Sequence, residues 1–179
     1  MTPTPTELGP LNSTWSHFVK AATRFAETRG AGGPIASDWR QLMMQMGSDI
    51  RHHAYHVAAL SVAIGNAMGM DSTRLDHLRL AALLHDVGKL AVPQAILAKA
   101  GPLTTNEWQI MRRHPVYART ILEAAHARPE VVDAAYAHHE RWDGTGYPRG
   151  IRGVEIPLSA RIVALGDVVD ALSSKRAYR

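Results

Sequence analysis

Apolar side chains recur at the three- and four-residue spacing of an α-helix along almost the whole chain from residue 38 onward. Residues 53–68 show this pattern in Val57, Leu60, Ile64, Ala67 and Met68. Little of the sequence alternates between apolar and polar residues as a half-buried β-strand does, and no segment repeats. The pattern therefore predicts an all-α fold, a single helical bundle.

Capping residues divide this pattern into separate helices. Asp71 or Ser72 is expected to cap one helix, and Thr104 and Glu107 have the spacing of a capping box. The expected helices cover residues 11–29, a segment from near 39, 53–68, 73–86, a segment after 104, and segments that begin at 115, 129 and 158. Residues 140–157 are rich in Gly and Pro and are expected to form a long irregular loop. Residues 1–37 are interpreted as a partly helical N-terminal extension, and residues 38–179 as the bundle domain.

Composition excludes several classes of site. The 179 residues include no cysteine, which rules out disulfides, thiolate metal ligands and cysteine nucleophiles and fits a reducing, cytoplasmic location. The formal net charge is +4, but Lys and Arg are scattered, so no nucleic-acid-binding surface is expected. The same charge suits an anionic substrate. No membrane segment or signal peptide is expected, because no apolar run is long enough.

Histidine and aspartate gather at the ends of the expected helices and beside loops. These residues offer the nitrogen and oxygen donors that borderline divalent metals accept. The candidate ligands are His53, His85, Asp86, His114, His138, His139 and Asp167. His52 and His56 compete for the role of His53, and Asp86 has the alternative of capping a helix or pairing with Lys89. Seven ligands with one bridging aspartate would suit two metal ions, with positions left for water and substrate.

Two further features lie close to these ligands in the sequence. Lys89 shares a helical face with His85 and Asp86, so it is either a surface lysine or a cation aimed at a substrate phosphate. The segment from Asp143 to Pro148, DGTGYP, is either a surface turn or one wall of a substrate site. In the second case the Tyr147 ring could stack on a base.

From about residue 49 to its end, the sequence resembles the HD-GYP family, a branch of the HD-domain metal-dependent phosphohydrolases. The resemblance rests on HAYHVA at His53, HDVGK from His85 to Lys89, His114-Pro115, HHE at His138, DGTGYP, and IPLSARIVALGDVVDAL from Ile156. The family implies an HD-type all-α bundle with a long GYP loop. It also implies a centre of two divalent ions, with Fe and Mn as the expected metals. The implied activity is that of a phosphodiesterase that cleaves cyclic di-GMP, a bacterial second messenger.

The resemblance also implies roles for individual residues. One metal would be held by His53, His85, Asp86 and Asp167, and the other by Asp86, His114, His138 and His139. Asp49 occupies the position of a Glu that helps to hold a third metal in some members. The implied substrate contacts are Lys89 near the scissile phosphate, Arg161, and the loop residues Asp143, Gly144, Gly146, Tyr147 and Pro148. Asp86 and Lys89 are the expected catalytic residues.

The expected reaction is attack on phosphorus by a hydroxide that bridges the two metals, giving linear pGpG, GMP or both. Two other functions stay open at this point. An HD-type hydrolase could act on another nucleotide, or an inactive module could bind a cyclic dinucleotide without cleaving it. The sequence does not decide the metal, the end product, the oligomeric state or the regulatory input.

Overall fold

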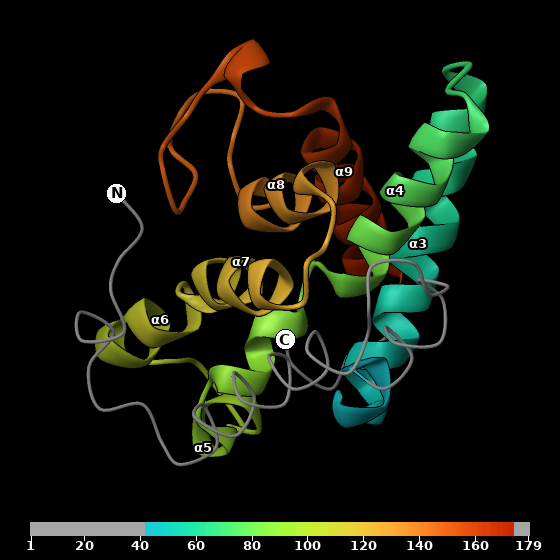
Figure 1. Cartoon of the computed structure of the whole chain (residues 1–179). Helices are drawn as coiled ribbons and strands as arrows, with labels where there is room; N and C mark the ends of the chain where they lie inside the picture. Colours follow the sequence, from blue (N-terminus) through green and yellow to red (C-terminus); the bar gives the residue numbers. More distant parts are fainter. Residues whose placement is uncertain (1–41, 174–179) are drawn as a thin grey trace.

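The computed structural model describes residues 42–173, and this part of the chain is helical without a strand, as the sequence predicts. The elements are α3 (Ser48–Ala67), α4 (Ser72–Leu84), the 3-10 helix η1 (Val87–Ala91), α5 (Gln94–Leu97), α6 (Thr105–Met111), α7 (His114–Ala124), α8 (Pro129–Ala137), the 3-10 helix η2 (Gly153–Glu155) and α9 (Leu158–Ser173) (Figure 1). The expected helix at 11–29, the boundary at residue 37 and the residues between them lie outside the described residues. None of the described helices is long and apolar enough to cross a membrane.

The predicted capping residues mark the ends of these helices. The Asp71 side chain accepts a hydrogen bond from the Arg74 backbone N–H (2.9 Å) and caps α4. Thr104 and Glu107 form the reciprocal capping box that opens α6. Gly69, which follows the C-cap residue Met68 of α3, has a φ of 73°, a left-handed conformation that glycine adopts without strain. Local side-chain hydrogen bonds and one glycine turn therefore set these boundaries.

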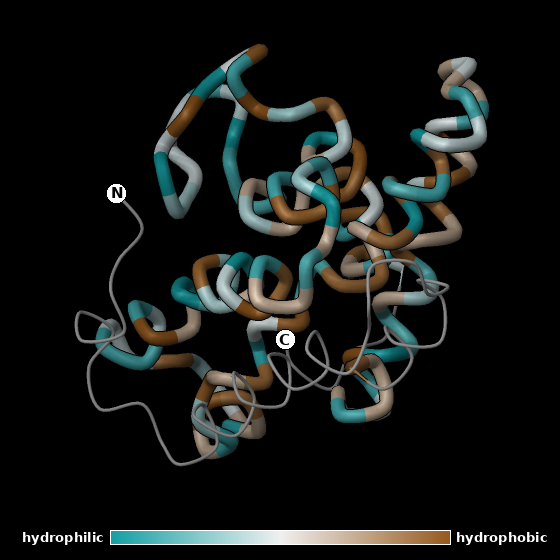
Figure 2. Tube along the Cα trace, viewed as in Figure 1, coloured by the Kyte–Doolittle hydropathy of each residue, from teal (hydrophilic) through white to brown (hydrophobic). Residues whose placement is uncertain are grey.

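Packing joins the helices into one bundle. Helix α3 packs against α4 and α9, while α7 packs against η1 and α8, and α8 also contacts α4 and α9. Figure 2 shows apolar and polar residues interleaved along the helices. The larger apolar cluster includes Met46, Leu84, Val87 and Ile121, and a second includes Val57 and Leu78.

The segment after α4 differs from the sequence prediction. The helix expected over 73–86 ends at Leu84, and the chain turns at His85 and Asp86 into η1. Gly88 permits this turn to lie directly on α7, because a Cβ at Gly88 would be 1.9 Å from the His114 carbonyl oxygen. Neither η1 nor α5 is marked by a helical pattern in the sequence. The close contact places Asp86 beside the start of α7.

Candidate metal centre

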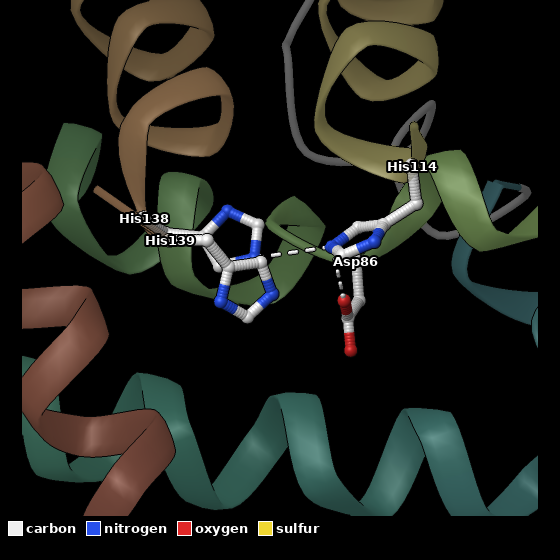
Figure 3. Close-up of side chains that lie close together, drawn as sticks. All are labelled: Asp86, His114, His138 and His139. Carbon is white, nitrogen blue, oxygen red and sulfur yellow. Dashed lines mark hydrogen bonds and ion pairs between the residues drawn. The ribbon is translucent and has the colours of Figure 1, made fainter. Parts of the chain in front are cut away.

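Two groups of potential metal ligands share Asp86. One group contains His53, His85 and Asp86, and within it one ligand atom of each residue lies within 4.8 Å of the others. The second contains Asp86, His114, His138 and His139 at the same separation. Figure 3 shows the second group, with His114 at the start of α7 and His138-His139 at the end of α8, turned toward one another and toward Asp86. Helix ends from distant parts of the chain thus meet at one aspartate.

Backbone carbonyls orient three of these imidazole rings. The Nδ1 atoms of His85, His114 and His138 lie 2.7, 2.9 and 2.7 Å from carbonyl oxygens of the preceding helical turn. A carbonyl only accepts, so each Nδ1 carries the proton and donates. Each Nε2 then keeps a lone pair that faces the centre, which is the arrangement of metal-ligating histidines in proteins.

Burial holds several of these histidines neutral. It is the main cause that lowers the pKa of His114 to about 3 and that of His139 to about 4, and it lowers the pKa of His138 well below 6.5. His85 is different: burial lowers its pKa, but the Asp86 carboxylate outweighs burial and the net pKa is raised. Three of the ring nitrogens are therefore available as ligands at neutral pH without first losing a proton.

Asp86 is ionised in this setting. Burial raises its pKa, but Lys89, His85 and His114 outweigh burial and hold the pKa well below the ordinary value. The Lys89 Nζ donates to Asp86 Oδ2 at 2.6 Å, while Oδ1 faces the His114 Nε2 at 3.3 Å. Although Asp86 directly precedes η1, its side chain makes no capping hydrogen bond. Of the two alternatives for Asp86, helix capping or pairing with Lys89, the structure contains the pairing with Lys89.

The polar atoms at the centre are consistent with a bound cation. Among the described residues, His85 Nε2 and Asp86 Oδ1 are buried without a hydrogen-bond partner. The Nε2 atoms of His114 and His138 are 3.3 Å apart, although each ring has its proton on Nδ1. Two facing lone pairs and two unsatisfied buried atoms are costly to leave without a partner. Divalent ions fit this donor set of imidazole nitrogen and carboxylate oxygen.

Tertiary structure separates the three neighbouring histidines of α3. His53 is buried, and its Nε2 lies 3.0 Å from Asp167 Oδ1. His52 is exposed, and the His56 Nδ1 lies 3.0 Å from Asp170 Oδ1 on α9. His53, rather than His52 or His56, therefore faces the centre. The exposed Asp49 belongs to neither ligand group and bonds to its neighbour Ser48.

The GYP loop closes against the second ligand group. The Tyr147 ring stacks on His139, with centroids 4.8 Å apart and planes inclined by 27°, and the Tyr147 N–H donates to the His139 carbonyl at 3.2 Å. The Tyr147–Pro148 peptide bond is cis. Gly146 is needed for this approach, because a Cβ there would be 2.3 Å from the Arg141 backbone nitrogen. The loop therefore forms a wall at His139.

Other predicted substrate contacts lie around this loop. Asp143 is exposed, and both the N–H and the hydroxyl of Thr145 donate to its Oδ1 in a local turn in which Gly144 has a φ of 80°. The Arg161 guanidinium lies 5.6 Å from the Trp142 ring centroid, and its Nε is buried without a partner among the described residues. Neither residue is part of the ligand groups, so their contact with substrate stays a prediction.

Three residues near the centre have contacts to which the sequence interpretation assigned no role. Asp170 contacts His53, the Arg112 guanidinium lies 4.4 Å from the Tyr147 ring centroid, and Glu140 Oε1 accepts from the Arg149 N–H at 2.7 Å across the base of the loop. Asp170 had a signal, since it lies one helical turn after Asp167 and shares its helix face. The positions of the other two depend on the path of the loop.

Comparison with known proteins identifies the family to which the chain belongs. The HD domain family model matches residues 11–179. A 3'3'-cGAMP-specific phosphodiesterase 2 from Vibrio cholerae is 42% identical over 129 residues, which are 71% of this chain and 25% of that protein. A cyclic di-GMP phosphodiesterase from Thermotoga maritima is 41% identical over 133 residues, which are 73% of this chain and 36% of that protein. This chain thus spans about a quarter to a third of the length of these relatives.

A solved structure has the same fold. It is Bd1817, an HDG"Y"P protein from Bdellovibrio bacteriovorus, with a TM-score of 0.63 and 23% identity over 96% of this chain and 56% of that one. The helical bundle and the match of the family model agree with the resemblance that the His and Asp motifs indicate. The chain belongs to the HD domain family, in its HD-GYP branch.

Proposed function

We propose that the protein is a metal-dependent phosphodiester hydrolase that cleaves cyclic di-GMP to linear pGpG, GMP or both. The observation that carries the proposal is the sharing of Asp86 by two buried groups of ligands. Two ions beside one carboxylate are typical of sites that hydrolyse phosphate esters. The names of the relatives support a cyclic dinucleotide as substrate.

We assign the ligands to two ions. His53, His85, Asp86 and Asp167 would hold one, and Asp86, His114, His138 and His139 would hold the other. Iron or manganese suits these nitrogen and oxygen donors. When bound, such ions act as Lewis acids on the phosphoryl group and lower the pKa of water. A cytoplasmic location fits a chain without cysteine.

The protein groups around the ions have separate tasks. The Lys89 side chain, about one quarter exposed, donates to Asp86 and would offset negative charge on a phosphate that arrives there. Tyr147 closes one side of the centre, and burial raises its pKa, so the phenol stays protonated and can donate a hydrogen bond. His139, on which the Tyr147 ring stacks, is uncharged at neutral pH. It therefore need not lose a proton before it binds a metal ion.

A substrate panel tests the proposal. Protein loaded with Mn²⁺ or Fe²⁺ is incubated with cyclic di-GMP, 3'3'-cGAMP and a nucleotide monoester, and products are separated by chromatography. Cleavage of cyclic di-GMP is expected. Cleavage of 3'3'-cGAMP alone would favour the alternative of an HD-type hydrolase that acts on another nucleotide. The name of the relative from Vibrio cholerae supports this alternative. Binding of cyclic di-GMP without turnover of any substrate would refute the hydrolase and indicate a binding module.

Removal of the shared ligand provides the matched variant. Asp86→Ala is expected to lose bound metal and hydrolysis together, because both ligand groups depend on this carboxylate. Asp76→Ala, at an exposed aspartate of α4, is the control and should keep both. Unchanged hydrolysis by Asp86→Ala would contradict the assignment.

A further inference from the structure

Asp170 is a buried carboxylate on α9 that lies behind the metal centre. Its side chain is 4% exposed, and Oδ2 lies 2.6 Å from His53 Nδ1. Its other oxygen, Oδ1, lies 3.0 Å from His56 Nδ1. An ionised carboxylate only accepts, so both imidazoles donate to it. Asp170 therefore holds the ring of His53 from the side away from the centre.

This contact sets His53 apart from the other oriented ligands. His85, His114 and His138 donate from Nδ1 to neutral backbone carbonyls. His53 alone among these four donates to a carboxylate. A negative acceptor strengthens the hydrogen bond, fixes the Nδ1-protonated tautomer and makes Nε2 a more basic ligand.

Negative charge is also distributed unequally over the two ligand groups. Asp167 Oδ1 lies 3.0 Å from His53 Nε2, so the His53 side has Asp167 and the shared Asp86, with Asp170 behind them. The other group has Asp86 as its one carboxylate, together with His114, His138 and His139. A divalent cation is stabilised more strongly where more carboxylate charge surrounds it.

We propose that Asp170 is a positioning residue for His53, and that it makes the His53 position bind its ion more tightly than the His139 position. His56 holds the second oxygen of Asp170 and fixes the orientation of the carboxylate. The inference rests on the two-ion centre of the proposed function. It does not depend on which substrate is cleaved.

Metal binding by Asp170→Asn tests the role. The amide keeps the shape of the side chain but removes the charge, and it cannot accept from both imidazoles. Titration of the metal-free protein with Mn²⁺ in a calorimeter should give two ions for the wild type. In Asp170→Asn one ion should bind about 10- to 100-fold more weakly, and the other should be unchanged. Glu107→Gln, which changes a partly exposed pair with Lys99, is the matched carboxylate-to-amide control and should bind as wild type.

Two results would overturn the inference. One is wild-type affinity for both ions in Asp170→Asn, and the other is an equal loss at both positions in a variant whose circular dichroism and melting temperature are unchanged. Should the variant not fold, nitrogen NMR of the zinc-loaded wild type gives the answer, since His53 must carry its proton on Nδ1. A His53 ring without that proton would refute the contact. Hydrolysis enters neither readout, so a failure to cleave substrate counts against the proposed function alone.

Discussion

Gly88 belongs to η1, two residues after Asp86, and lies at the point where η1 packs on the first turns of α7. A Cβ at this position would be 1.9 Å from the His114 carbonyl oxygen and 2.5 Å from the Ala118 backbone nitrogen. Both atoms belong to backbone, which cannot rotate away as a side chain can. Gly88→Ala therefore forces η1 and α7 apart.

The size of the effect follows from this overlap. Ordinary contact begins at 3.4 Å, so the two elements must separate by about 1.5 Å at this point. Overpacking of this kind costs about 3 kcal/mol. For a chain of this size, that free energy corresponds to a melting temperature lower by roughly 6–12 °C. Because Asp86 and His114 lie on either side of the contact, a shift of 1 Å should also reduce hydrolysis by about 100-fold.

Urea unfolding and thermal melting of metal-free protein measure the loss of stability. Gly47→Ala is the control, since its Cβ would meet nothing within 4 Å. That position precedes α3, so the change should stay within about 1 kcal/mol. An unfolding free energy of Gly88→Ala within 1 kcal/mol of the wild type would show that η1 does not depend on this close approach.

Three further perturbations have defined outcomes. Gly146→Ala should move the GYP loop away from the Arg141 backbone and reduce hydrolysis with little change in melting temperature, as turnover assays and calorimetry will show. Lys89→Met should keep the bound metal measured by elemental analysis but lower kcat by more than tenfold, since the variant loses the cation that we propose to face the phosphate. Metal-free protein should lose stability as pH falls from about 6.5 toward 4. The unfolded chain takes up protons at the ordinary histidine pKa, whereas folded His114 and His139 do so only at about 3 and 4. Unfolding free energies that stay flat over this range would contradict the burial of neutral histidines.

Helix boundaries were predictable where a local polar group sets them. Asp71 and the Thr104–Glu107 box act through hydrogen bonds to neighbouring backbone, so their meaning is contained in a few consecutive residues. The turn at His85 could not be read in this way. The helix expected from the sequence extends to residue 86, and what ends α4 at Leu84 is the packing of Gly88 on a helix more than 20 residues later in the chain.

Sequence by itself determined the all-α class and the main helices and indicated the candidate ligand residues, because helical periodicity, caps and His/Asp motifs are properties of neighbouring residues. Only the tertiary structure decided which of His52, His53 and His56 faces the centre, since that choice depends on where α9 crosses α3. It also revealed Asp170 behind His53, a contact between residues 117 positions apart. Local chemistry is encoded along the chain, whereas the partners of a buried charge are set by which helices pack together.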